Sequence, residues 1–157
     1  MARQKVQLQD LFAFVGLDTS VIIDLMMLSA AKEFFEEKIY LFEENLLFTH
    51  RMCLAVGLGL LIGNYGFSKE EARKKIQAFL EEFKITILEL DENLEEDQKY
   101  VFVIGKKYGW SGDQIINDAI IIASFWRKGI NMVVVRDRVF EMVCTELKIN
   151  VLSFPLF

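Results

Sequence analysis

Short apolar runs separated by longer segments of helical periodicity dominate the hydrophobic pattern of the chain. Runs that are bounded by polar or turn residues and rich in branched or alternating apolar side chains favour buried strands. They predict strands over Phe12–Leu17, Asn45–Thr49, Lys84–Leu90, Asn131–Val135 and Ile149–Leu152.

The segments between these runs have apolar residues three and four positions apart, as one face of a helix requires. Capping-box patterns, Ser68 with Glu71 and Ser111 with Gln114, mark the start of two of them. The predicted helices cover Thr19–Leu28, Ser29–Glu44, Met52–Gly63, a segment after Ser68, Asp91–Tyr108, a segment from Ser111 to Gly129, and Asp137–Lys148. Because strands alternate with helices, the predicted fold class is α/β, a three-layer α/β/α arrangement with a central, mainly parallel sheet.

The length of 157 residues suits one domain, which we expect to span residues 1–157, with residues 1–12 as an N-terminal extension. The longest charge-free window, Met52 to Ser68, contains several glycines and is shorter than the roughly 20 apolar residues of a membrane span. The first residues lack the apolar stretch of a signal peptide, and the two cysteines lie far apart beside a single histidine. We therefore expect a cytoplasmic protein with no membrane association, disulfide framework or zinc site.

The net charge of −5 argues at first against a nucleic-acid partner, but the charge is unevenly distributed. The segment from Glu81 to Asp97 contains eight acidic residues and one lysine, which leaves a net charge of +2 on the rest of the chain. A solvated helix face explains this acidic segment, and a polyanion could still bind elsewhere.

Three aspartates lie where the predicted strands bring distant parts of the chain together. Asp18 follows the first strand, Asp137 comes one residue after Val133–Val135, and Asp118 lies in the helix before that strand, preceded by Asn117 and Asp113. Ligands bind at the carboxyl ends of the strands in such sheets. Carboxylates there suit Mg²⁺ or Mn²⁺, which take oxygen ligands and can activate water for attack on a phosphate. Singly, each aspartate could equally be a helix cap or a solvated residue.

The sequence around these aspartates resembles the PIN domain family of metal-dependent ribonucleases. The matching motifs are GLDTSVIIDL (Gly16 to Leu25), NDAIIIAS (Asn117 to Ser124) and VVVRDRVF (Val133 to Phe140), in the order and spacing of the family. The resemblance implies an endoribonuclease that hydrolyses RNA phosphodiester bonds, of the kind found in RNA processing or as the toxin of toxin–antitoxin pairs. It implies that Asp18, Asp118 and Asp137 are catalytic residues that coordinate Mg²⁺ or Mn²⁺, with Thr19 or Ser20 beside them.

One departure from the family pattern leaves a second function open. The family usually places a glutamate on the helix after the second strand, whereas Met52 to Gly63 contains no acid, and Glu43 and Glu44 precede that strand. Asp113 could partly compensate as a metal ligand. The alternative is therefore a catalytically impaired PIN-like module that binds RNA or another protein.

Several further residues are candidates for contact with RNA or with a protein partner. His50 follows the second strand, and Arg136 and Arg138 flank Asp137, so these three and Asn117 are candidates for substrate binding. The helix from Gly112 to Lys128 has more apolar surface than one face toward a sheet requires. From this surplus and from the family resemblance we expect a two-fold homodimer, and an antitoxin or another protein is a further candidate partner.

Overall fold

The computed structural model describes residues 12–39, 44–111 and 114–157. Its strands are β1 (Phe12–Leu17), β2 (Glu44–His50), β3 (Thr86–Leu88), β4 (Met132–Val135) and β5 (Asn150–Ser153). Its helices are α2 (Thr19–Met27), α3 (Ser29–Ile39), α4 (Arg51–Gly63), α5 (Lys69–Phe83), the short 3₁₀ helix η2 (Glu92–Leu94), α6 (Glu95–Lys107), α7 (Gln114–Lys128) and α8 (Arg138–Glu146).

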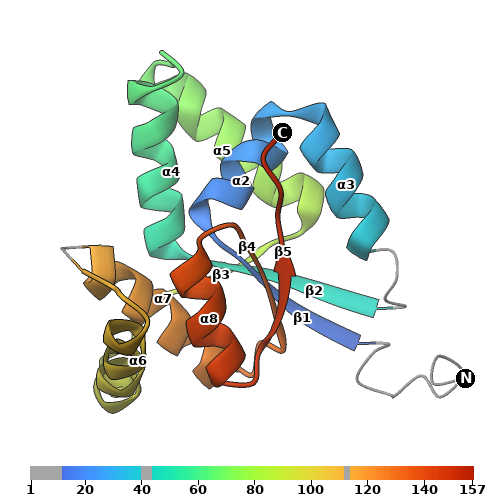
Figure 1. Ribbon diagram of the computed structural model, residues 1–157. Coiled ribbons are helices and arrows are strands. Elements are labelled where there is room, and N and C mark those ends of the chain that lie inside the picture. The colour runs from blue at the N-terminus through green and yellow to red at the C-terminus, as the bar shows by residue number, and fades with distance from the viewer. Residues whose placement is uncertain (1–11, 40–43, 112–113) are drawn as a thin grey trace, which may run out of the picture.

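The five strands form one sheet in the order β3-β2-β1-β4-β5, and every pairing is parallel. Helices α2 to α5 cover one face and helices α6 to α8 cover the other, as Figure 1 shows. The predicted three-layer α/β/α class is therefore confirmed. The chain first builds outward from β1 through β2 to β3 and then returns to add β4 and β5 on the other side of β1.

The core lies on both faces of β1 and β4, the central strands of the sheet. Val15, Leu17 and Val133 are fully buried, together with Phe125 of α7 and Phe140 of α8. Gly16 allows a close approach in this core, since a Cβ atom there would lie 2.8 Å from a ring carbon of Phe125. This contact fixes α7 directly against the centre of β1.

Most predicted elements are confirmed, and the differences lie at their ends. The capping box of Ser68 and Glu71 is present at the start of α5. Strand β3 is shorter than predicted because Lys84 adopts a left-handed conformation that ends α5, and because β3 pairs only with β2. Glu44 begins β2 instead of ending the preceding helix. Residues 112 and 113 of the second predicted capping box, and residues 1–11 of the predicted extension, lie outside the described residues.

The apolar residues of α7 are mostly used inside the chain. Five of them are buried: Ala119, Ile121, Ile122, Ala123 and Phe125. Ile116 remains 53% exposed, and Tyr100 and Val103 on α6 are exposed as well. The surplus available to a second subunit is therefore smaller than the sequence predicts. Within the described part of the chain, every helix is too short or too polar to cross a bilayer.

Candidate metal-binding active site

A cavity of about 400 Å³ opens at the carboxyl ends of β1 and β4. This is where the chain switches from one side of the sheet to the other, the position at which open α/β sheets bind ligands. One side, here called the acidic wall, consists of Asp18, Asp118 and Asp137. The other, here called the α4 wall, consists of Met52, Val56 and Leu60. Thr19, Ser20, Asn117, Ile121 and Arg136 complete the lining.

Asp18 is the first residue after β1 and stands at the N-cap position of α2, yet its side chain makes no capping hydrogen bond. The Cys53 thiol instead lies 3.8 Å from Asp18 Oδ1 and donates to it. Burial raises the pKa of Asp18, the backbone N–H of Thr19 lowers it, and repulsion from Asp137 raises it again. Burial also raises the pKa of Cys53 to about 12, so this thiol stays protonated at neutral pH.

Asp118 projects from α7 and is half-buried. Its pKa is raised to about 7, first by burial and then by repulsion from Asp18 and Asp137. The repulsion shows that the three carboxylates, from distant parts of the sequence, share one electrostatic environment.

Asp137 is exposed and caps α8, since its Oδ1 accepts a hydrogen bond of 2.9 Å from the backbone N–H of Phe140. The capping explanation considered for this residue is therefore correct, but it uses only one carboxylate oxygen. The second oxygen makes no hydrogen bond to any described residue and remains available to a ligand.

The α4 wall contains no acid. Val56 lines the cavity and is 46% exposed, whereas Gly57, one residue further, is buried and faces Ile23. Val56 is thus an exposed residue of α4 at which a carboxylate would enter the cavity. Glu44 lies at the far end of β2 and cannot take this role.

The donor atoms of the acidic wall fit a hard divalent cation, because carboxylate oxygens are the ligands that Mg²⁺ and Mn²⁺ prefer. Among the residues described, no three His, Cys, Asp or Glu side chains form a cluster tight enough to enclose a metal ion. The arrangement suits Mg²⁺, which binds through one or two carboxylates and completes its shell with water and substrate phosphates.

The other sequence candidates divide into residues inside the cavity and residues outside it. Thr19, Ser20, Asn117 and Arg136 line the cavity, and Arg138 is exposed but does not. His50, a candidate for substrate binding, does not line the cavity. The ring is fully buried, and its Nδ1 accepts from the backbone N–H of Met52, because α4 begins directly after β2. Asp113 lies outside the described residues.

The sequence does not predict the contacts of two residues in this region. Asp24 pairs with Arg136 although 112 positions separate them, and Cys53 lies beneath Asp18. The sequence signal for Asp24 is its place as an acid within the apolar segment Val21 to Leu25, which lies in helix α2.

No family model and no curated protein matches the sequence, but solved structures do resemble it. A chain of VapBC2 from Rickettsia felis, solved bound to a DNA fragment from its promoter, has a TM-score of 0.66 at 14% identity, covering 90% of this chain and 99% of its own. FitAcB from Neisseria gonorrhoeae has a TM-score of 0.63 at 18% identity, covering 89% and 97%. VapC20 from Mycobacterium tuberculosis, a toxin that cleaves the sarcin-ricin loop, has a TM-score of 0.59 at 20% identity, covering 80% and 92%.

These likenesses extend over most of this chain and nearly the whole of each similar chain. They agree with the motifs around Asp18, Asp118 and Asp137, which resemble the PIN domain family. The chain therefore has the fold of a PIN domain, the fold of the VapC and FitB toxins.

Proposed function

We propose that this protein is an endoribonuclease that depends on Mg²⁺ or Mn²⁺ and hydrolyses RNA phosphodiester bonds. The observation that carries the proposal is the acidic wall: three aspartates from three elements line one cavity at the switch point of the sheet. Folding alone does not require them to share it. Burial and mutual repulsion raise the pKa values of Asp18 and Asp118, and such perturbed carboxylates in a cavity indicate a functional site. VapC20, which shares the fold, is a toxin that cleaves the sarcin-ricin loop.

In this proposal the acidic wall would hold the cation, and nearby residues would hold the RNA. Asp18, Asp118 and Asp137 supply the ligand oxygens. A bound Mg²⁺ or Mn²⁺ would make water a stronger nucleophile at neutral pH and offset negative charge on the phosphate. Arg136 faces the same cavity and would bind a phosphate oxygen, while Thr19, Ser20 and Asn117 offer hydrogen bonds to the substrate.

A second candidate function follows from the α4 wall. The family usually has a glutamate on the helix after the second strand, whereas α4 contains no acid, so the cavity holds one negative charge fewer than a complete site. The alternative is a PIN-like module that has lost hydrolysis and binds RNA or a protein. A cation is bound less firmly by fewer carboxylates, so metal affinity is the property that separates the two functions.

Cleavage of single-stranded and structured RNA in Mg²⁺, Mn²⁺ and EDTA tests the proposal. We expect cleavage with either metal and none in EDTA. Cleavage that persists in EDTA contradicts a metal-dependent mechanism. Wild-type protein that binds RNA without cutting it, while Val56→Glu gains activity, supports the impaired module instead.

We further propose that the protein works with protein partners. The similar structures VapBC2 and FitAB were both solved bound to DNA, and the resemblance to the PIN domain family implies toxin–antitoxin pairs, so an antitoxin is the partner we expect. A homodimer is proposed through the exposed apolar residues Tyr100, Val103 and Ile116. Sedimentation at micromolar concentration tests the dimer, and a monomer there would contradict it.

A further inference from the structure

The guanidinium of Arg136 contacts groups outside the acidic wall. Its Nη2 donates to Asp24 Oδ2 and, over 2.9 Å, to the backbone carbonyl of Pro155. Its central carbon lies 5.9 Å from the ring centroid of Phe154. Asp24 is only 9% exposed and Phe154 is buried, so the ion pair and the ring contact come from the packed interior, whereas Pro155 is exposed.

This arrangement is unusual for an arginine that lines a cavity with three carboxylates. Arg136 precedes Asp137 in the chain and shares the cavity with Asp18 and Asp118. Within the described residues, however, its ion pair is with Asp24 and with none of the three cavity acids. An arginine that turned toward the acidic wall would occupy the oxygens that a cation needs and cancel part of their charge.

The guanidinium keeps one unused donor group, Nη1. Nη1 forms no hydrogen bond with the described chain, whereas Nε also lacks a partner but is buried. A guanidinium fixed at Nη2 with Nη1 free can bind a phosphate oxygen without rearrangement.

From these contacts we infer that Asp24 is a positioning residue, which holds Arg136 off the acidic wall and keeps its free Nη1 available to an RNA phosphate. The inference rests on the proposed function. Asp24 does not touch the cation or the RNA, and it acts only through Arg136. Loss of the Asp24 charge should therefore weaken cation binding, because Arg136 is still present and can turn toward the acidic wall.

Titration of the metal-free protein with Mn²⁺ by calorimetry tests this, because it needs neither RNA nor cleavage. Asp24→Asn keeps the shape of the side chain and removes its charge. We expect it to weaken Mn²⁺ binding by at least about tenfold, the range seen when an outer residue that orients a metal site is lost. The double variant Asp24→Asn with Arg136→Gln should recover the affinity of Arg136→Gln alone, since the displaced charge is gone.

Asp97→Asn is the matched control, because Asp97 also pairs with an arginine, Arg127, but outside the cavity. It should leave Mn²⁺ affinity within about twofold of wild type. A folded Asp24→Asn protein with wild-type affinity overturns the inference, and so does a double variant as weak as Asp24→Asn.

The folded state of each variant, followed by circular dichroism, completes the test. Loss of folding in Asp24→Asn that Arg136→Gln restores supports an action through Arg136. Loss that Arg136→Gln does not restore overturns it, because Asp24 would then serve the core alone. Wild-type protein that binds no Mn²⁺ contradicts the proposed function itself, which distinguishes that failure from the failure of the inference.

Discussion

The acidic wall and the α4 wall line the same cavity, but they differ in charge. The acidic wall has three carboxylates, two of them with raised pKa values, and the α4 wall presents Met52, Val56 and Leu60. Asp18 and Asp137 follow the parallel strands β1 and β4, Asp118 lies on α7, and the α4 wall follows the parallel strand β2. Segments that line one cavity can thus be charged or apolar. The fold therefore fixes where the cavity lies, but the side chains decide whether it suits a metal ion.

The largest effect is expected from the acidic wall. Asp18→Asn and Asp137→Asn should each lower metal-stimulated RNA cleavage by at least about 100-fold, because each removes a charged ligand. Folding should survive in Asp137→Asn, since asparagine caps a helix as well as aspartate does and Asp137 caps α8. Initial rates on a labelled RNA in Mn²⁺ measure the effect.

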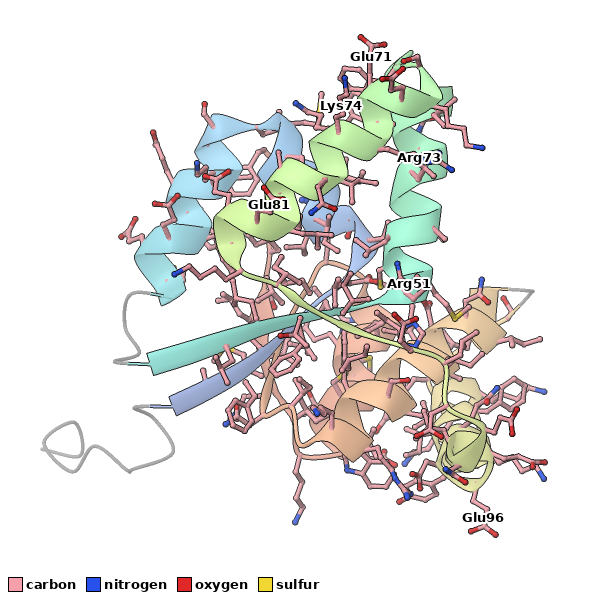
Figure 2. The ribbon with its side chains drawn as sticks, turned by 180° about the vertical axis from the view of Figure 1, so that it is seen from behind. Arg51, Glu71, Arg73, Lys74, Glu81 and Glu96 are labelled. Carbon is pink, nitrogen blue, oxygen red and sulfur yellow. The ribbon has the colours of Figure 1, made fainter. Side chains whose placement is uncertain are left out.

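Glu96→Gln is the matched control for these variants. Glu96 is an exposed acid at the outer end of α6, pointing away from the body of the molecule in Figure 2. Its neutralisation should leave the rate unchanged. Equal losses in Glu96→Gln and Asp18→Asn would mean that overall charge, and not the acidic wall, controls the reaction.

The next prediction concerns the α4 wall, to which a glutamate can add a metal ligand. Val56→Glu should raise Mn²⁺ affinity by about tenfold, because a fourth carboxylate adds a ligand at an exposed position. Ala55→Glu is the control, as Ala55 is exposed on the same helix but does not line the cavity. Gly57→Glu should instead destabilise the protein, since it would bury a charge against Ile23. Equal gains from Val56→Glu and Ala55→Glu would show a non-specific effect of charge.

Asp18 and Asp137 of the acidic wall were predictable from the sequence because they adjoin strands with clear hydrophobic patterns, whereas Asp118 lies within α7. Val133–Val135 marks β4 and thereby the place of Asp137, and the run before Asp18 marks β1 in the same way. The alternation of strands and helices was sufficient to predict the three layers and the parallel direction of the strands.

What the sequence could not supply depends on the rotation of helices and on contacts between distant segments. The pattern of α4 leaves Val56 and Gly57 equivalent, and only the packed helix shows which one lines the cavity. The burial of His50 depends on the direct passage from β2 into α4, with no intervening loop. Arg51, at the base of α4 in Figure 2, pairs with Glu89 beyond β3, a contact across 38 positions that no local pattern indicates.

The pH dependence of stability separates the two walls by a smaller effect. Folding raises the pKa of Asp118 from 3.8 to about 7, so the folded state binds its proton more tightly than the unfolded state does. The stability from this proton is fully present below pH 4 and is lost as the pH rises to about 7. The metal-free protein should therefore be more stable at pH 5 than at pH 8, by about 1 to 2 kcal/mol relative to Asp118→Asn, after allowance for partial exposure.

Urea unfolding of both proteins at the two pH values measures this difference. Saturating Mn²⁺ should reverse the sign for wild type, because the cation binds the deprotonated carboxylate and stabilises the folded state most at pH 8. A Val56→Ala variant should show the wild-type pH dependence, since the α4 wall does not titrate. Identical pH profiles in wild type and Asp118→Asn would contradict the raised pKa.

The smallest effect is expected at Cys53, which joins the two walls. Its side chain extends from α4, is fully buried, and donates to Asp18 Oδ1 over 3.8 Å. A thiol is a weak donor, so Cys53→Ala should change Mn²⁺ affinity by less than about threefold. The variant should lower the free energy of unfolding by about 1 kcal/mol, because it leaves a small cavity in the core. Calorimetric titration and urea unfolding check the two values. If Cys53→Ala weakened Mn²⁺ binding as much as Asp18→Asn, α4 would control the geometry of the acidic wall, and the two walls could no longer be treated as independent.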